Sequence, residues 1–255
     1  MSLGITEKTQ KSLLKVGSHI DTARVRAASA PESGQWLHAI PVPSLGTFLD
    51  AEQLRIGISL RIGAEICRSH KCRCDMTITP DGHHGLSCKY SSARIQRHNE
   101  INDVIQWALS RANVPSTLEQ VGLCHDSQKR VDGLTRQPFK NGKYMCWDVT
   151  CVDTFSQSNV SQCAIDAGSA AKDAETQKRR KYAELAETYQ FEPIAVETTG
   201  VYGPSTRKLI SAIGSRIRAI TDDPCETQWL LQRIRLAVQR GNALAIELGS
   251  KSAFC

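Results

Sequence analysis

Four residues between positions 72 and 88 have the types and the spacing of a metal site. They are two cysteines one residue apart and, after a loop of nine residues, a histidine and a third cysteine: Cys72, Cys74, His84 and Cys88. Thiolate and imidazole are ligands that zinc prefers, and four of them close a tetrahedral cage that can order a loop with no core of its own. The pattern predicts a structural Zn²⁺ with no open position for catalysis. Because the first pair is unusually close, Cys67, His70 and His83 stay open as alternative ligands; the competing interpretation is that these residues bind no metal.

Two aspartates lie where a hairpin would bring them together. Asn141-Gly142 is a strong hairpin-turn signal, and residues 143–152 after it are rich in aromatic and β-branched types. Asp148 falls in the middle of this predicted strand, where a carboxylate is costly unless a cation meets it. Asp132 lies at the start of the preceding hairpin strand. Two converging carboxylates predict a hard-oxygen site for Mg²⁺.

A lysine is predicted to face these acids from a neighbouring helix. The Ala-rich stretch 163–187 carries Ala171, Ala174, Lys178 and Lys181 at spacings of three and four residues, which is one face of a helix. An inward lysine beside two carboxylates could neutralise charge on a phosphodiester. The alternative is a salt bridge that only fixes the helix against the sheet.

The elements around these residues alternate between helix and strand. An apolar face at helical spacing predicts a helix over residues 95–112, and two basic amphipathic helices close the chain. The pattern indicates an α/β (α+β) class with a mixed sheet flanked by helices. The other expected elements are strands near 117–123, 130–134 and 191–198 and helices over 1–30, 205–220 and 226–245.

Composition limits the classes of protein that the chain can belong to. Its 255 residues are 40% hydrophobic, with a net charge of +6 and ten cysteines. No apolar run is long enough for a membrane span, and the first residues lack the apolar region of a secretory signal. We therefore expect no membrane association and a reducing intracellular compartment.

Cations recur outside the predicted site and would suit a polyanionic partner. They flank the metal cluster and lie along the two closing helices; an ordinary solvated helix face is the alternative for each run. These residues are Lys89, Arg94, Arg97, Arg207, Lys208, Arg216, Arg218, Arg233, Arg235 and Arg240.

Over roughly residues 35–247 the sequence resembles the restriction-enzyme-like endonuclease region of non-LTR retrotransposon polyproteins. The order of the motifs carries the resemblance, from the Cys/His cluster through two aspartates to a Lys-x-x-Lys-Tyr pattern. The matching stretches are Arg97-His98-Asn99, Leu118-Glu119, Lys129-Arg130-Val131-Asp132-Gly133, Trp147-Asp148-Val149-Thr150 and Lys178-Arg179-Arg180-Lys181-Tyr182.

The resemblance implies a PD-(D/E)xK nuclease core that cuts DNA with a Mg²⁺-activated water. Asp132 and Asp148 would hold Mg²⁺, Lys178 would replace the lysine usually found at the position of Thr150, and Glu119 and Lys181 would add an acid and a cation. Val131 departs from the motif's proline. DNA and the RNA of a retroelement are the implied partners, in a nuclear or cytoplasmic location. The alternative is an inactive, zinc-containing nucleic-acid-binding module.

The resemblance also implies a division of the chain into four parts. Because no reverse-transcriptase signature is present, we expect a fragment of a retroelement or a host protein derived from one. The parts are a helical extension (1–34), a linker or thumb-like remnant (35–66), a zinc knuckle (67–90) and the endonuclease-like domain (91–255).

Overall fold

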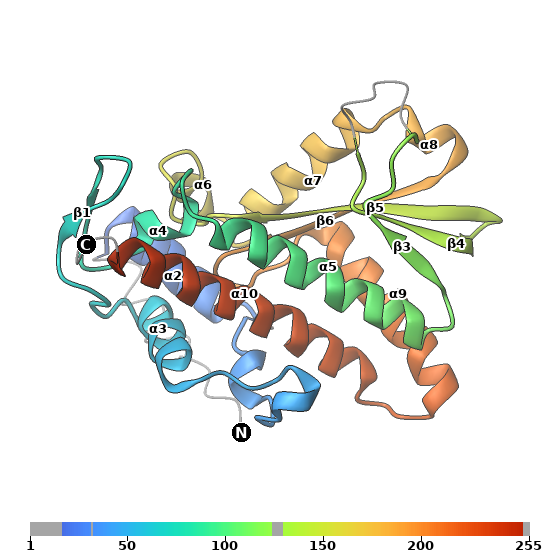
Figure 1. Cartoon of the computed structure of the whole chain (residues 1–255), viewed down its shortest axis with the longest axis horizontal. Coiled ribbons are helices and arrows are strands. Elements are labelled where there is room, and N and C mark those ends of the chain that lie inside the picture. The colour runs from blue at the N-terminus through green and yellow to red at the C-terminus, as the bar shows by residue number, and fades with distance from the viewer. Residues whose placement is uncertain (1–16, 32, 124–129, 252–255) are drawn as a thin grey trace.

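A four-stranded mixed sheet forms the centre of the molecule. The computed structural model describes residues 17–31, 33–123 and 130–251. The strand order is β3-β4-β5-β6, with antiparallel pairing except between β5 and β6, which run parallel. Helices cover both faces of the sheet (Figure 1), so the predicted class, a mixed sheet flanked by helices, is confirmed. The strands are β3 (Ser116–Leu118), β4 (Gly133–Lys140), β5 (Lys143–Val152) and β6 (Gln190–Glu197).

The turn between β4 and β5 follows the sequence signal. Asn141 and Gly142 both have positive φ, 52° and 73°, as a type I′ hairpin turn requires at its two central residues. The hairpin closes with Lys140 opposite Lys143, and its other end pairs Gly133 with Trp147. The register shifts between these two pairs, on either side of Pro138, and the pairing at the Gly133 end places Asp132 beside Asp148.

The segment between β5 and β6 differs from its prediction. One helix was expected over residues 163–187, whereas the structure has three. The chain breaks at Gly168, whose φ of 92° only glycine adopts without strain and which begins the second helix. The three helices are α6 (Val160–Cys163), α7 (Ser169–Lys181) and α8 (Leu185–Thr188).

The main core lies on the face of the sheet opposite α7. It is built from α5 (Ala93–Arg111), α9 (Pro204–Thr221) and α10 (Glu226–Lys251), which pack against the side chains of β5 and β6. Trp147 on β5 is fully buried in it. These three helices confirm the predicted amphipathic segments, with bounds extended by a few residues. In the part of the chain that the structure describes, no helix has the length and apolar character needed to cross a membrane.

Small side chains let α7 approach the other face of the sheet. Ala171 and Ala174 pack against Ala195 of β6, and a stripe of alanines permits a short distance between helix and strand. The following residue on this face of the helix is Lys178, four positions after Ala174. The same stripe that docks α7 therefore directs Lys178 toward β5.

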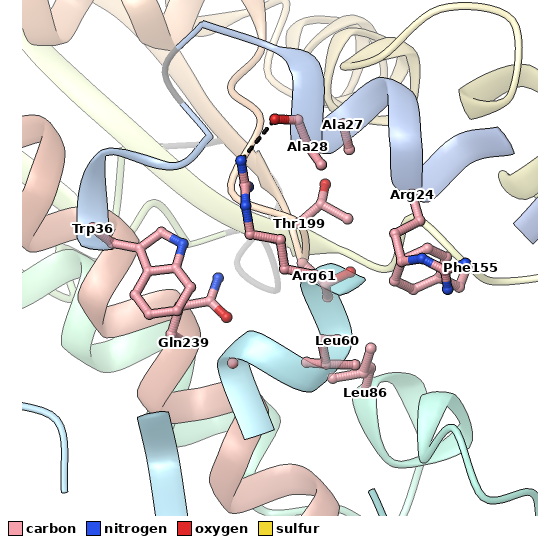
Figure 2. Close-up of a pocket in the computed structure, with 12 residues that line it drawn as sticks. Arg24, Ala27, Ala28, Trp36, Leu60, Arg61, Leu86, Phe155, Thr199 and Gln239 are labelled. Atoms are coloured by element: carbon pink, nitrogen blue, oxygen red, sulfur yellow. Dashed lines mark hydrogen bonds between the residues drawn. The ribbon is translucent and has the colours of Figure 1, made fainter. Parts of the chain in front are cut away.

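The N-terminal and cysteine-rich segments pack against the C-terminal half of α10, the dark red helix of Figure 1. Ile56 and Leu60 of α3, Leu86 of α4 and Ile246 of α10 belong to one buried apolar cluster. Near it, Arg61 donates to the carbonyl of Ala28 at 2.7 Å (Figure 2). The pocket drawn in Figure 2 measures about 20 Å³, room for about one water, and is therefore a packing defect and no ligand site. The elements of this half are α2 (His19–Ser29), η1 (Gln35–His38), η2 (Pro43–Leu45), α3 (Ala51–Ile62), β1 (His70–Lys71), β2 (Thr77–Ile78) and α4 (His83–Ser87).

A buried acid at the end of β6 ties the sheet to α7. Glu197 is 0% exposed, and its carboxylate accepts hydrogen bonds from the Ala170 amide and the Thr154 hydroxyl, both at 3.2 Å. The Cys163 thiol donates to the same carboxylate at 3.6 Å, and burial raises the pKa of this thiol to about 11. Burial also raises the pKa of Glu197, and the hydrogen bonds offset only part of this effect.

The raised pKa of Glu197 predicts a pH dependence of stability that Glu197→Gln removes. The folded state holds a proton on Glu197 more tightly than the unfolded state does, so this contribution to the free energy of unfolding is full below the unfolded pKa near 4.5 and falls as pH rises through the folded value. Urea unfolding should therefore show the variant gaining stability relative to the wild type as pH rises from about 4.5 through the folded pKa of Glu197. Glu187→Gln, at an exposed position of α8, is the control; a similar gain in both variants would contradict the prediction.

Candidate metal centre and acidic site

The four predicted zinc ligands lie together. The ligand atoms of Cys72, Cys74, His84 and Cys88 are all within 4.8 Å of one another. The sulfurs of Cys72 and Cys88 are 3.6 Å apart, and the sulfur of Cys74 lies 3.1 Å from Nε2 of His84. With Zn–S bonds of about 2.3 Å, tetrahedral geometry separates two sulfurs by about 3.8 Å. The donor types and the spacing fit, so this cluster could hold a metal ion such as zinc.

Short elements on either side of the cluster fix its ligands. The β1–β2 hairpin pairs His70 with Ile78 and turns at Asp75, whose φ is 66°; Cys72 directly follows β1, and Cys74 lies in the turn. Gly82 begins α4 with a φ of 68°, and a Cβ there would lie 3.2 Å from Ile246 of α10. The close approach of α4 to α10 therefore depends on a glycine, and it holds His84 over the hairpin.

The three alternative ligands have other partners. Cys67 contacts the carbonyl of Thr79 at 3.6 Å. The two ring nitrogens of His70 lie 2.7 Å from the Arg68 carbonyl and 3.0 Å from the Gly249 carbonyl. His83 stacks on Phe155 with ring centroids 4.2 Å apart. The structure thus gathers the set of four that the spacing predicts and leaves the alternatives outside it.

The pKa values of two thiols in the cluster, Cys72 and Cys74, are shifted in opposite directions. Burial raises the pKa of Cys72 to about 11, whereas the Met76 amide, by donating to the sulfur of Cys74, lowers the pKa of that thiol. A metal binds the thiolate, so loading this cluster must displace protons.

Asp132 lies at the point where β4 begins, beside the middle of β5. Its amide donates to the Trp147 carbonyl at 2.9 Å, and its Oδ2 accepts from the Val149 amide at 2.6 Å. The carboxylate therefore bonds to the residue next to Asp148. This is the cross-hairpin proximity that the sequence predicts, and the Gly133–Trp147 pairing explains it.

Asp148 is buried and meets the predicted lysine. Its carboxylate forms an ion pair with Lys178 of α7, and the residue is only 4% exposed. The Lys178 side chain is 23% exposed and so reaches both the acid and solvent. A cation thus offsets the cost of burying this carboxylate.

A histidine and an amide on α5 complete the surroundings of Asp132. Nε2 of His98 lies 3.2 Å from Oδ1 of Asp132, and Asn102 contacts the same nitrogen at 3.1 Å while its own oxygen accepts from the Trp147 indole at 2.9 Å. Burial favours a higher pKa for Asp132, but the hydrogen bonds and charge of His98, with the Val149 and Asn102 hydrogen bonds, hold this pKa below its usual value. Asp132 in turn raises the pKa of His98 through their hydrogen bond.

Sequence reasoning gave Asn102 no role. The signal that could have identified Asn102 was its position four residues after His98, among the apolar residues Ile101, Val104 and Ile105 of the predicted helix.

The remaining predicted site residues have different surroundings. The Glu119 side chain is 71% exposed and lies 3.5 Å from Arg130, although its amide donates to the Asp132 carbonyl at 2.7 Å. Lys181 is exposed at the end of α7, with Nζ 4.6 Å from the centroid of the Tyr182 ring. The structure brings neither side chain into a described contact with the aspartates. Lys129 lies outside the described residues.

Several of the cations expected on the surface are structural. Arg97 and Arg235 are 2% and 0% exposed; Arg97 donates to Asn242 and to the Leu86 carbonyl, and Arg235 to the Gly200 carbonyl. Arg240 pairs with Glu100 at 3.2 Å. Both interpretations of these cations, an anion-binding surface and a solvated helix face, place them in solvent; helix packing instead buries Arg97 and Arg235 and leaves Arg240 half-buried. Lys89, Arg94, Lys208 and Arg218 are exposed.

Asp132, paired with His98 of α5, and Asp148, paired with Lys178 of α7, therefore lie at neighbouring positions along β5. Such a group can bind a hard cation, offset negative charge and hold a proton. The chain matches no known protein-family pattern and no curated protein.

Proposed function

We propose that this protein is a retroelement-derived, Mg²⁺-dependent DNA endonuclease of the PD-(D/E)xK type, with a structural zinc at the four-residue cluster. One observation carries the proposal: Lys178 of α7 pairs with Asp148 of β5, while the Asp132 carboxylate bonds to the amide of Val149, the next residue. The amine and the acids come from separate elements, and their contacts fall on two consecutive residues of β5, Asp148 and Val149.

The residues present fit a hard cation. Each carboxylate oxygen has two lone pairs, so the hydrogen bonds to Asp132 and the ion pair of Asp148 leave acceptor sites for Mg²⁺. Mg²⁺ bound there would supply positive charge at the phosphate and activate the attacking water. Lys178 would stabilise the charge that develops on the phosphate, and His98 would hold or release a proton at Nε2 beside Asp132.

A non-catalytic nucleic-acid-binding module is the second candidate. Each aspartate already has a basic partner, Lys178 for Asp148 and His98 for Asp132. This neutralisation suits a structural role in holding α5 and α7 to the sheet as well as it suits catalysis.

Nicking of supercoiled plasmid separates the two candidates. We expect Mg²⁺-dependent nicking by the zinc-loaded wild type, reduced about 10²–10³-fold in Lys178→Gln because a charge-stabilising donor is lost. Arg180→Gln makes the same charge change at an exposed position of α7 and should nick like the wild type. The unfolding midpoint of each variant checks that it is folded. DNA binding without any nicking would support the inactive module and refute the nuclease.

A further inference from the structure

A basic pocket lies next to the acidic site. It has a volume of about 310 Å³ and is lined in part by Lys89, Arg94, Arg97, His98 and Thr150. The described residues that line it include three permanent cations and no acid. A hollow with this charge attracts an anion.

The pocket adjoins the acids on two sides. His98 belongs to its wall and also pairs with Asp132. Thr150 belongs to its wall and follows Asp148 by two residues on β5, which is about 7 Å along a strand. A ligand in the pocket would therefore lie alongside a group held at Asp132 and Asp148.

The walls hold polar atoms with no partner. Nε of Arg97 and Oγ of Ser91 are both buried and make no hydrogen bond within the described structure. Arg97 is 2% exposed, and a donor buried without an acceptor is costly unless a ligand supplies one. Ser91 stands just before α5, whose first turn contains no acid and whose N-terminus has no side-chain cap. The amides there favour a negative group as well.

We propose that this pocket binds a phosphate of the DNA strand. This phosphate would neighbour the one that is cleaved at the site of Asp132 and Asp148. The assignment rests on the proposed nuclease function for its ligand. A phosphodiester in the pocket would face the exposed charges of Lys89 and Arg94, with the charge of Arg97 in the wall behind them. The pocket thereby holds the strand in place beside the acids and takes no part in bond cleavage.

Salt-dependent DNA binding tests the pocket without any cleavage. The binding constant of the zinc-loaded full chain for a short DNA duplex is measured at several salt concentrations, without added Mg²⁺ and without chelator. Each cation that neutralises one phosphate contributes about 0.9 to the slope of log K against log salt. Arg94→Gln and Lys89→Gln should each make this negative slope shallower by about this amount. Both positions are exposed, so the fold should be kept; Arg97 is avoided because it also bonds to α4 and α10.

Arg136→Gln, at an exposed position of β4 that does not line the pocket, is the charge-matched control. The proposal is overturned if the wild type shows no salt-dependent binding, or if the two pocket variants alter the slope no more than the control does. If the pocket variants make the slope shallower and plasmid nicking is absent, the phosphate site stands and the nuclease assignment fails.

Discussion

Replacing Asp148 with asparagine is expected to lower Mg²⁺-dependent nicking by about a thousandfold. A catalytic metal ion contributes several kcal/mol to transition-state stabilisation, and each 1.36 kcal/mol corresponds to a tenfold change in rate. Asparagine keeps the shape of the side chain and one oxygen but loses the charge that binds the cation. Initial nicking rates at saturating Mg²⁺ measure the effect.

Stability must be followed in the same variant, because Asp148 is also the partner of Lys178. The Lys178 side chain is partly exposed, so its charge can turn to water when the acid is removed, and the fold should survive. Asp173→Asn, at an exposed position of α7, controls for the loss of one negative charge. A folded Asp148→Asn protein that nicks within a few-fold of the wild type would remove Asp148 from the proposed mechanism.

Replacing Cys72 with serine is expected to abolish zinc binding and to open the cysteine-rich segment. A cage of four ligands loses most of its affinity with one thiolate, and structural zinc sites supply folding free energy directly. Leu86 and Ile78, which are 1% and 3% exposed, would then lose their packing. Exposing a buried leucine costs about 1.5–3 kcal/mol, so the free energy of unfolding should fall by at least that amount.

Zinc content after dialysis and urea unfolding measure these two effects. Cys67→Ser is the matched control, because Cys67 lies in the same segment and contacts the Thr79 carbonyl outside the cluster. It should keep one zinc per chain. Equal zinc content in the two variants would contradict the assignment of ligands, and a zinc-free Cys72→Ser protein of unchanged stability would contradict a structural role.

Local patterns in the sequence were sufficient to predict several of the helices and strands and part of the site. The Asn141-Gly142 turn sets the β4–β5 hairpin, and the alanine stripe orients Lys178, because each depends on residues close in sequence. The spacing of Cys72, Cys74, His84 and Cys88 specified the cluster for the same reason.

Features that depend on distant segments could not be predicted in this way. Arg97 looks like a solvated helix cation until α10 places Asn242 beside it. At the same crossing, a Cβ on Gly241 would lie 2.4 Å from Cβ of Arg97, so the glycine allows the two helices to approach. The Glu197 network joins residues more than thirty positions apart, among them Thr154. The break at Gly168 follows from a backbone conformation that helical periodicity does not report.

Arg97 and His98 are consecutive residues of α5 that contact different parts of the molecule. Arg97 donates to the backbone carbonyl of Leu86 in the segment of the Cys/His cluster, and His98 contacts the Asp132 carboxylate. A single peptide unit therefore mechanically connects the cysteine cage to the acid pair. We expect that disrupting the Cys/His cluster weakens the hydrogen bond from Arg97 to Leu86. The position of the neighbouring His98, which contacts Asp132, would then be less well fixed.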